Sequence, residues 1–171
     1  MKDEMVDIVD ENNKSLYKTS KREAHRKGLL HRTVISEIID AKGRWLLFIP
    51  SSHKQDAGQY VSPIGGHVRS GESETDALKR EAFEEAGLKD FKFKFVGKDI
   101  YNRFVIRRQE NHFFIVYEIY SDKKPVLSDE TNSFRYFTRK EIKDKMRTNS
   151  EIFGGAFHFV YKNIYKEFSE T

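Results

Sequence analysis

Short stretches of alternating or continuous apolar residues recur along the chain and predict a fold rich in β-strands. In Phe91–Phe95 phenylalanine and lysine alternate strictly, as expected of a strand that buries one face. Two apolar runs, Thr33–Ile39 and Trp45–Ile49, flank a polar segment that ends in Gly43, which is typical of a β-hairpin. The other predicted strands are Met5–Val9, Leu16–Lys18, Gln59–Ile64, Phe104–Ile106, Phe113–Tyr120 and Phe134–Phe137.

Four segments of the chain carry helical signals. Glu74–Ala86 has the clearest boundaries, because Ser73 is a good N-cap and Gly87 stands where a helix ends. The other predicted helices are Lys21–Arg26, Lys140–Met146 and Ala156–Phe168. Strands around one central helix, followed by further helices, predict an α+β fold with a mixed sheet sandwiched by helices. The chain has no repeat or linker, so we expect a single domain over residues 1–171, with residues 1–30 packed on it.

Charge and composition narrow the range of partners. The chain has 31 lysine and arginine residues against 27 acidic ones, a net charge of +4. This excess suits a solvated surface or a phosphorylated substrate, and because no RNA-binding consensus or cysteine/histidine finger accompanies it, a nucleic-acid partner is not expected. No apolar stretch approaches the about 18 residues of a membrane span, so no membrane partner is expected either. Cysteine is absent, which excludes disulfides, thiolate metal sites and a cysteine nucleophile and fits a cytoplasmic location.

Acidic residues of the central helix form a stripe. At about 100° per residue, Glu81, Glu84 and Glu85 fall within an arc of about 100°, and Glu74 projects in the same direction. Like charges at this spacing repel one another, and a divalent cation offsets that repulsion directly. Hard carboxylate oxygens suit Mg²⁺ or Mn²⁺. Taken alone, the stripe fits a solvated helix face, with Arg80 as an ordinary ion-pair partner, at least as well.

A longer pattern around this helix decides between the two interpretations. Residues 66–88 read G-x5-E-x7-R-E-U-x-E-E-x-G-U, where U is an aliphatic residue, and the segment resembles the signature of the Nudix hydrolase family. Seven fixed positions at roughly 6% each would all match by chance in about three windows per 10⁹. The matching residues are Gly66, Glu72, Arg80, Glu81, Glu84, Glu85 and Gly87, with Ala82 and Leu88 at the aliphatic positions.

The resemblance implies a fold, a reaction and a cofactor. The fold is an α/β/α sandwich with a mixed sheet, in which the motif forms a loop–helix–loop that binds a diphosphate through Mg²⁺ or Mn²⁺. The reaction is hydrolysis of the diphosphate bond in a nucleoside diphosphate linked to another group. Attack of water on a diphosphate requires neutralised phosphate oxygens and a water held in line, and a metal held by carboxylates supplies both.

The resemblance also implies roles for the motif residues. Arg80 matches the arginine that pairs with and positions the glutamates, whereas Glu72 and Gly87 match supporting positions. A further metal or base group usually comes from a later loop in this family, and the candidates here are Glu110, Asp129 and Glu130. The residues that match the metal ligands and catalytic carboxylates are Glu81, Glu84 and Glu85, joined in the metal shell by the backbone carbonyl of Gly66.

A second likeness points to one branch of this superfamily, the isopentenyl-diphosphate isomerase-like proteins. Asp7–Asn12, Ala24–Arg32 and Gly65–His67 are similar to segments of that branch. In the isomerases, histidines at these positions bind a metal together with two later glutamates. Histidine in place of one glutamate would shift the preference from Mg²⁺ toward Zn²⁺ or Mn²⁺. The candidates for this second metal site, which we expect to approach one another near the active cleft, are His25, His31, His67, Glu110 and His112.

Isomerase activity itself is not expected. The catalytic cysteine of those enzymes falls at about Gly65, and this chain has no cysteine. An isomerase-like protein and a Nudix-fold binding module without catalysis stay open as alternatives to a hydrolase, and the binding module is disfavoured because every motif carboxylate remains. The segments expected to set specificity, around Ser51–Tyr60 and Asp99–Gln109, carry no decisive pattern. The linked group, the oligomeric state and the general base therefore stay open.

Overall fold

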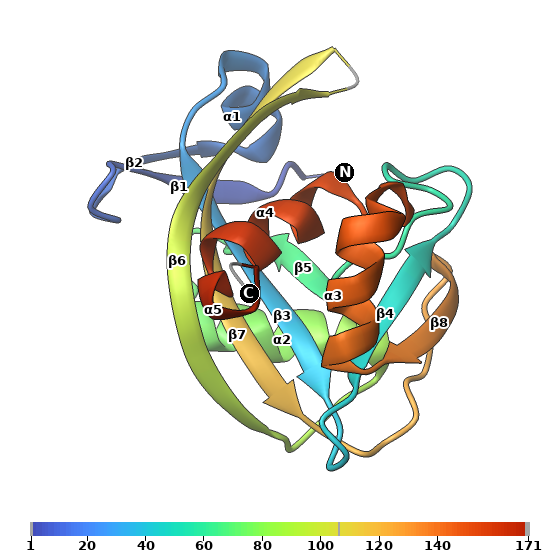
Figure 1. The fold of residues 1–171 in the computed structure, drawn as a ribbon. Coiled ribbons are helices and arrows are strands. Elements are labelled where there is room, and N and C mark those ends of the chain that lie inside the picture. Colours follow the sequence, from blue (N-terminus) through green and yellow to red (C-terminus); the bar gives the residue numbers. More distant parts are fainter. Residues whose placement is uncertain (1, 106, 170–171) are drawn as a thin grey trace.

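A mixed sheet of eight strands runs through the molecule, with helices on both of its faces (Figure 1). The computed structural model describes residues 2–105 and 107–169. The strands within these residues are β1 (Met5–Val9), β2 (Ser15–Ser20), β3 (His31–Ile39), β4 (Trp45–Pro50), β5 (Ile64–His67), β6 (Lys92–Val105), β7 (Arg108–Tyr120) and β8 (Thr131–Phe137). The helices are α1 (Lys21–Lys27), α2 (Glu74–Ala86), α3 (Arg139–Thr148), α4 (Gly155–Asn163) and α5 (Lys166–Ser169). None of these helices is long and apolar enough to cross a membrane.

Strand β3 lies at the centre of the sheet because it pairs with four other strands. One of its edges runs parallel to β7 over its whole length, from His31 beside His112 to Ile39 beside Tyr120. Its other edge pairs in succession with β1, β5 and β4, each antiparallel. Strands β5 and β4 therefore follow one another along the same edge of β3, and residues 51–63 form the connection between them.

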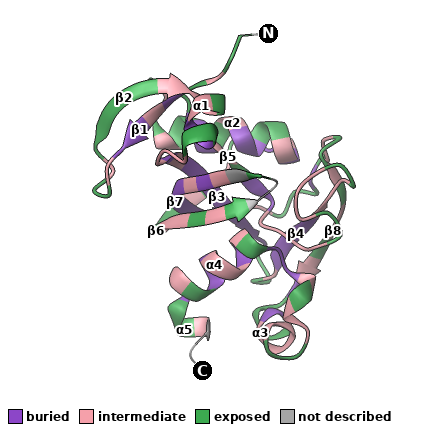
Figure 2. Cartoon of the chain, turned by 90° about the horizontal axis from the view of Figure 1, so that it is seen from above, coloured by how far each residue is buried: buried purple, intermediate pink, exposed green. Residues whose placement is uncertain are grey.

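Alternate side chains of β3 belong to two separate cores, because successive side chains of a strand point to opposite faces. Val34 belongs to the same core as Leu78 of α2, which covers one face of the sheet. Ile35 belongs to the other core, together with Ile142 of α3 and Phe157 of α4. Figure 2 shows α2 on one side of the strands and α3 and α4 on the other. The predicted α+β fold, with helices on both faces of a mixed sheet, is confirmed.

Two predictions about strands were wrong. The strand predicted at Gln59–Ile64 is displaced, since β5 begins at Ile64 and residues 60 and 61 form only isolated bridges. Pro63 has no N–H to donate to a neighbouring strand, which prevents the preceding residues from continuing the ladder. The strands predicted at Phe91–Phe95 and Phe104–Ile106 are one strand, β6, which pairs with β7 from end to end apart from one bulge. Ile106 itself lies outside the described residues.

The helix predicted at Ala156–Phe168 is interrupted and forms two helices, α4 and α5. Tyr165 lies between them, with its ring centroid 4.9 Å from that of Trp45. Its hydroxyl donates a hydrogen bond of 2.9 Å to Glu118 on β7. The break between α4 and α5 thus coincides with the tertiary contacts of Tyr165, which helical periodicity in the sequence cannot predict.

Candidate active site

Helix α2 carries most of the residues that the sequence marks as functional. Ser73 caps it by accepting a hydrogen bond of 3.1 Å from the backbone N–H of Asp76, and Gly87 ends it with a left-handed φ of +67°. Along the side that packs on the sheet, Leu78 and Ala82 are completely buried. With this side packed on the sheet, the carboxylate of Glu81 faces β5 and that of Glu85 faces the segment before β8.

Arg80 joins three parts of the motif. Its guanidinium donates hydrogen bonds to Glu72 at 2.8 Å and to Glu81 at 2.6 Å. A third hydrogen bond, of 2.9 Å, runs to the backbone carbonyl of His67. Burial opposes the ionisation of Glu72, but the hydrogen bonds from Arg80 and from the backbone N–H of Arg69 prevail and lower its pKa. Arg80 therefore fixes α2 to the end of β5 and contacts three motif glutamates, Glu72, Glu81 and, at 3.5 Å, Glu84.

Glu81 and Gly66 are in direct contact. Glu81 is 8% exposed, and its carboxylate lies so close to the Cα of Gly66 that a Cβ at position 66 would overlap with it. Gly66 does not have a left-handed φ, so this close approach, rather than backbone freedom, is what requires glycine here. Burial raises the pKa of Glu81, although Arg80 donates a hydrogen bond to it.

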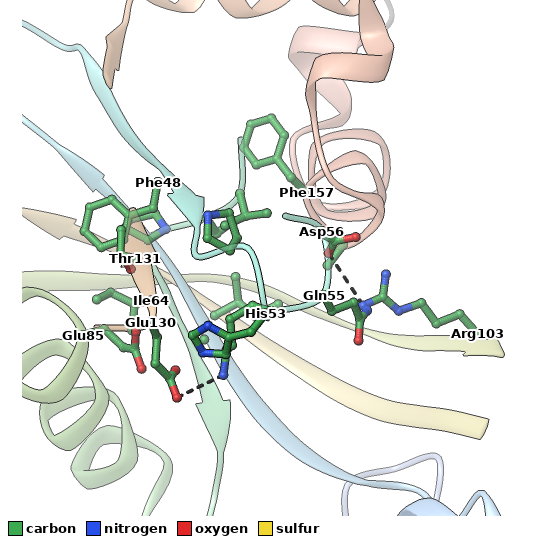
Figure 3. A pocket seen from close by; sticks show the side chains of 18 residues that line it. Phe48, His53, Gln55, Asp56, Ile64, Glu85, Arg103, Glu130, Thr131 and Phe157 are labelled. Carbon is green, nitrogen blue, oxygen red and sulfur yellow. Dashed lines mark ion pairs between the residues drawn. The ribbon is translucent and has the colours of Figure 1, made fainter. Parts of the chain in front are cut away.

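Glu84 and Glu85 lie in different environments. The Glu84 side chain is 48% exposed. Glu85 lines a cavity beside Glu130, which comes from the segment before β8 (Figure 3). Burial, followed by the charges of Glu130 and Glu81, raises the pKa of Glu85 to about 7. The Lys54 ammonium lies 3.0 Å from the Glu130 carboxylate. Among the candidates from later loops, Glu130 is therefore the one that the structure brings to the motif.

The other acidic candidates lie elsewhere. Glu74 accepts a hydrogen bond of 3.0 Å from Asn13, which connects it to the turn between β1 and β2. Glu110 accepts one of 3.2 Å from Arg103. Asp129 is exposed. Helical periodicity places Glu74 on the same side of α2 as the motif glutamates, but it does not predict that the Glu74 side chain contacts Asn13.

The cavity beside Glu85 has a volume of about 530 Å³. Glu85 and Glu130 lie at one end of it, and Asp56 and Arg103 lie at the other (Figure 3). Its floor and walls are largely apolar. Residues that form them are Ile35, Phe48, Val61, Ile64 and Phe157. One elongated cavity thus connects a carboxylate pair with an ion pair.

Sequence reasoning missed Lys54, Asp56 and Arg103 as residues of this cavity. They belong to the two segments from which specificity was expected, residues 51–60 and 99–109, but no motif or spacing marks them. Their meeting depends on β6 passing the first turn of α4, where Arg103 approaches Gly155. No signal within either segment encodes that contact.

Four histidines meet at a second place, and they come from α1, β3, β5 and β7. The ligand atoms of His25, His31, His67 and His112 all lie within 4.8 Å of one another. The Nε2 atom of His25 is 3.3 Å from that of His112 and 3.3 Å from that of His67. Of the five candidates for this second site, the structure thus brings the four histidines together, whereas Glu110 accepts a hydrogen bond from Arg103.

The hydrogen bonding of His31 favours metal ligation. Its Nδ1 lies 2.7 Å from the backbone carbonyl of Leu29 and must donate to it, because a carbonyl oxygen only accepts. Nε2 of the neutral ring then carries a lone pair, and it is buried without a partner. Burial lowers the pKa of both His31 and His67, which favours the neutral imidazole in each. Neutral imidazole is the form that binds metals.

Comparison with known proteins decides the family. The family profile described as the NUDIX domain matches residues 29–153. This chain belongs to the Nudix family. Isopentenyl-diphosphate Delta-isomerase of Serratia proteamaculans is 28% identical to it over 167 residues, which covers 95% of this chain and 92% of the isomerase. An uncharacterised Nudix hydrolase of Streptomyces coelicolor is 38% identical over 108 residues, or 57% of each chain.

Solved structures confirm the Nudix fold, since the MutT NUDIX hydrolase from Burkholderia pseudomallei matches with a TM-score of 0.63 at 18% identity, covering 79% of this chain and 98% of that one. Protein DR0079 from Deinococcus radiodurans matches with a TM-score of 0.75 at 19% identity, covering 93% of this chain and 98% of that one. The match to the NUDIX domain and the relatives named as isomerases place the chain in the isopentenyl-diphosphate isomerase-like branch of the Nudix family. Gly65, at about the position of the isomerase cysteine, lines the cavity, and nothing lies within 4 Å of where its Cβ would stand.

Proposed function

We propose that this Nudix protein hydrolyses a diphosphate bond in a nucleoside diphosphate linked to another group and needs Mg²⁺ or Mn²⁺ to do so. The observation that carries the proposal is the meeting of the motif helix with Glu130 at one end of the cavity. Like charges held together in a partly buried place are unfavourable unless a cation or a proton offsets them. A diphosphate with its metal would supply that cation.

The donor set fits a hard divalent cation. Glu81, Glu84 and Glu85 offer carboxylate oxygens along one side of α2, and the contact of Glu81 with Gly66 brings the backbone of β5 beside them. When bound there, the cation neutralises charge on the diphosphate oxygens and lowers the pKa of the attacking water. We assign Glu130 as the acidic group from a later loop.

Arg80 acts as a positioning residue in this proposal. It holds the carboxylate of Glu81 and, through Glu72 and the carbonyl of His67, fixes the helix against the strand that carries Gly66. Glycine at position 66 keeps that contact close. Gly87 ends the helix after its last functional carboxylate, with its N–H bonded to the carbonyl of Phe83 at 2.9 Å.

The substrate class is supported by the volume of the cavity and by one structural neighbour. A volume of about 530 Å³ lies within the range of roughly 300–1,000 Å³ that is usual for small-molecule sites. The Nudix domain of Shewanella oneidensis NrtR, which was solved in complex with ADP ribose, matches this chain with a TM-score of 0.58 at 13% identity. A nucleoside diphosphate derivative is therefore the class that we propose.

A hydrolysis screen tests the proposed function. Purified protein is incubated with nucleotide sugars, dinucleotide polyphosphates and nucleoside di- and triphosphates, with Mg²⁺, with Mn²⁺ and with EDTA. We expect turnover of at least one derivative, and only with metal. Turnover that persists in EDTA, or no turnover across the panel, would contradict the proposal.

We also propose that the four histidines bind a second divalent metal. Four imidazole nitrogens converge, and that of His31 has no other partner. Imidazole suits transition metals better than Mg²⁺, and four imidazole nitrogens fit a tetrahedral Zn²⁺. Zn²⁺ is therefore the ion expected here, with Mn²⁺ as the weaker alternative.

Isomerase activity is the second candidate function, and the observation that favours it is the set of relatives named as isomerases. The chain offers Gly65 where those enzymes have their catalytic cysteine, and it has no other thiol. We therefore expect that the protein does not isomerise isopentenyl diphosphate.

A further inference from the structure

The end of the cavity that lies away from the motif contains a second group of charged side chains. Asp56 Oδ2 lies 3.8 Å from Nη2 of Arg103, and the two side chains are 20% and 21% exposed (Figure 3). Arg103 is held from behind, because its Nε donates to Glu110 at 3.2 Å and its guanidinium lies 5.4 Å from the ring centre of Tyr101. The Gln55 amide oxygen also accepts hydrogen bonds from the Arg103 guanidinium, and Gln55, Asp56 and Arg103 all line the cavity.

The backbone is shaped to place this pair. Asp56 has a left-handed φ of +60°, a conformation that aspartate tolerates better than most non-glycine residues. Two consecutive glycines begin α4 opposite the pair. A Cβ at Gly154 would stand 3.3 Å from Asp56 Oδ2, and a Cβ at Gly155 would stand 3.1 Å from Arg103 Nη1. A side chain at position 154 or 155 would thus crowd the charged groups of Asp56 and Arg103.

The chemistry of the pair indicates what it can recognise. A carboxylate only accepts hydrogen bonds and a guanidinium only donates them, so the pair presents an acceptor beside a donor. An incoming group must therefore offer an N–H beside a ring nitrogen or a carbonyl. The Watson–Crick edge of a nucleobase has this arrangement.

The local charge argues against a second phosphate at this place. Arg103 is a single cation between two carboxylates, those of Asp56 and Glu110, so the group carries a formal charge of −1. An anion entering here would meet net repulsion, whereas a neutral polar edge would not. The apolar wall, which includes Phe48 and Phe157, suits the faces of a planar ring.

We propose that Asp56 and Arg103 bind the Watson–Crick edge of the substrate's nucleobase and are the specificity-determining residues of this site. The inference rests on the proposed function, because the diphosphate at Glu85 sets the direction in which the nucleoside lies. The base then occupies the far end of the cavity, between the connection that follows β4 and the first turn of α4.

Calorimetric titration of nucleoside monophosphates tests this inference without any turnover. Cytidine 5′-monophosphate and ribose 5-phosphate are titrated into the protein in Mg²⁺, since the two ligands differ only by the base. We expect the nucleotide to bind at least about tenfold more tightly. In Asp56→Asn the nucleotide should lose about tenfold in affinity, while ribose 5-phosphate binds as before. Arg103→Lys should behave likewise, because it keeps the charge but loses the planar fork.

The chain offers a matched control for the first variant. Asp90 also has a left-handed φ, of +47°, and it is exposed and does not line this cavity. Asp90→Asn makes the same chemical change in the same backbone conformation, and asparagine tolerates that conformation well. We expect it to leave the affinities for both ligands unchanged.

Each outcome has a defined meaning. Equal affinity of the wild-type protein for the nucleotide and for ribose 5-phosphate, or an Asp56→Asn variant that binds the nucleotide as tightly as the wild type, overturns the inference. Absence of binding by every ligand at millimolar concentration overturns it as well. Base-dependent binding that Asp56→Asn abolishes, in a protein that hydrolyses nothing in the screen, supports the inference and contradicts the proposed hydrolase.

Discussion

The absence of a side chain at Gly66 leaves room for the carboxylate of Glu81. A methyl group at this position would occupy the space of the Glu81 carboxylate, so overpacking should lower stability by roughly 1–3 kcal/mol. Gly65→Ala is the matched control, because nothing lies within 4 Å of the added methyl. Thermal melts of both variants check this. A Gly66→Ala protein as stable as Gly65→Ala would mean that Glu81 moves aside freely.

Glu84 and Glu85 are expected to act through their charge. Replacing either with glutamine keeps shape and helix propensity but removes one negative charge from the proposed metal site, so turnover should fall by at least about 10²-fold. Stability without metal should hold or rise slightly, because repulsion along the helix is relieved.

Glu74→Gln is the control for these variants, since Glu74 lies on the same helix but contacts Asn13 instead. Kinetics and metal-free melts of the three variants separate the explanations. Equal losses at all three positions would indicate general damage to α2. Unchanged turnover in both Glu84→Gln and Glu85→Gln would mean that the motif is not used.

Glu37 on β3 is completely buried and makes stability depend on pH. Its Oε1 accepts a hydrogen bond of 2.5 Å from Ser62, its Oε2 has no partner, and burial raises its pKa from 4.5 to about 8. Between these values the unfolded chain is ionised while the folded protein keeps the proton. This group therefore lowers stability progressively as the pH rises from about 4.5 to about 8.

Glu37→Gln should accordingly stabilise the protein at alkaline pH. The gain over the wild type should be roughly 2–4 kcal/mol at pH 8.5 and close to zero at pH 4.5. Urea unfolding of both proteins at the two pH values measures it. A gain that is the same at both values would show that Glu37 does not change its ionisation on folding.

At the scale of elements, the histidines connect α1 with three strands, so a metal bound there should stabilise the folded protein. An ion present at a hundred times its Kd adds about 2.7 kcal/mol, which corresponds to a rise in Tm of about 5–10 °C for a chain of this size. We expect this rise with Zn²⁺ in the wild type and its loss in His25→Asn. The exposed His53 provides the control variant His53→Asn, which should respond as the wild type does.

Elements whose ends are set locally could be predicted to the residue. Glu74–Ala86 and Met5–Val9 have the predicted bounds, in the first case because Ser73 and Gly87 act as caps next to the helix that they limit. The bounds of β5 could not be predicted, because its pairing partner is the distant strand β3 and nothing in residues 64–67 themselves encodes that pairing. The same holds for the break before α5, which follows the packing of Tyr165.

The candidate site divides in the same way. Spacing along one helix places Glu81, Glu84 and Glu85 on a common side, so the motif could be read from the sequence. Asp56 and Arg103 are 47 positions apart in different segments, and only the packing of β6 against α4 brings them together. Such pairs leave no trace in periodicity or in local composition.

At the scale of the whole molecule, one cavity in an isomerase-like protein is lined both by Glu85 of the Nudix motif and by Gly65, the residue at the position expected for the isomerase cysteine. We expect no conversion of isopentenyl diphosphate to dimethylallyl diphosphate, because no cysteine is available to move the proton. Product analysis after prolonged incubation with Mg²⁺ and Zn²⁺ checks this. Conversion that scales with the amount of purified protein would show that another residue replaces the cysteine.

The open space at Gly65 also allows a chemical probe to be placed in the cavity. Because the chain contains no cysteine, Gly65→Cys would carry a single thiol, and that thiol would stand inside the cavity. Its alkylation by iodoacetamide would then report occupancy directly, since any molecule lying along the floor of the cavity shields the sulfur. A protein with no natural thiol thus has room for one where it would be most informative.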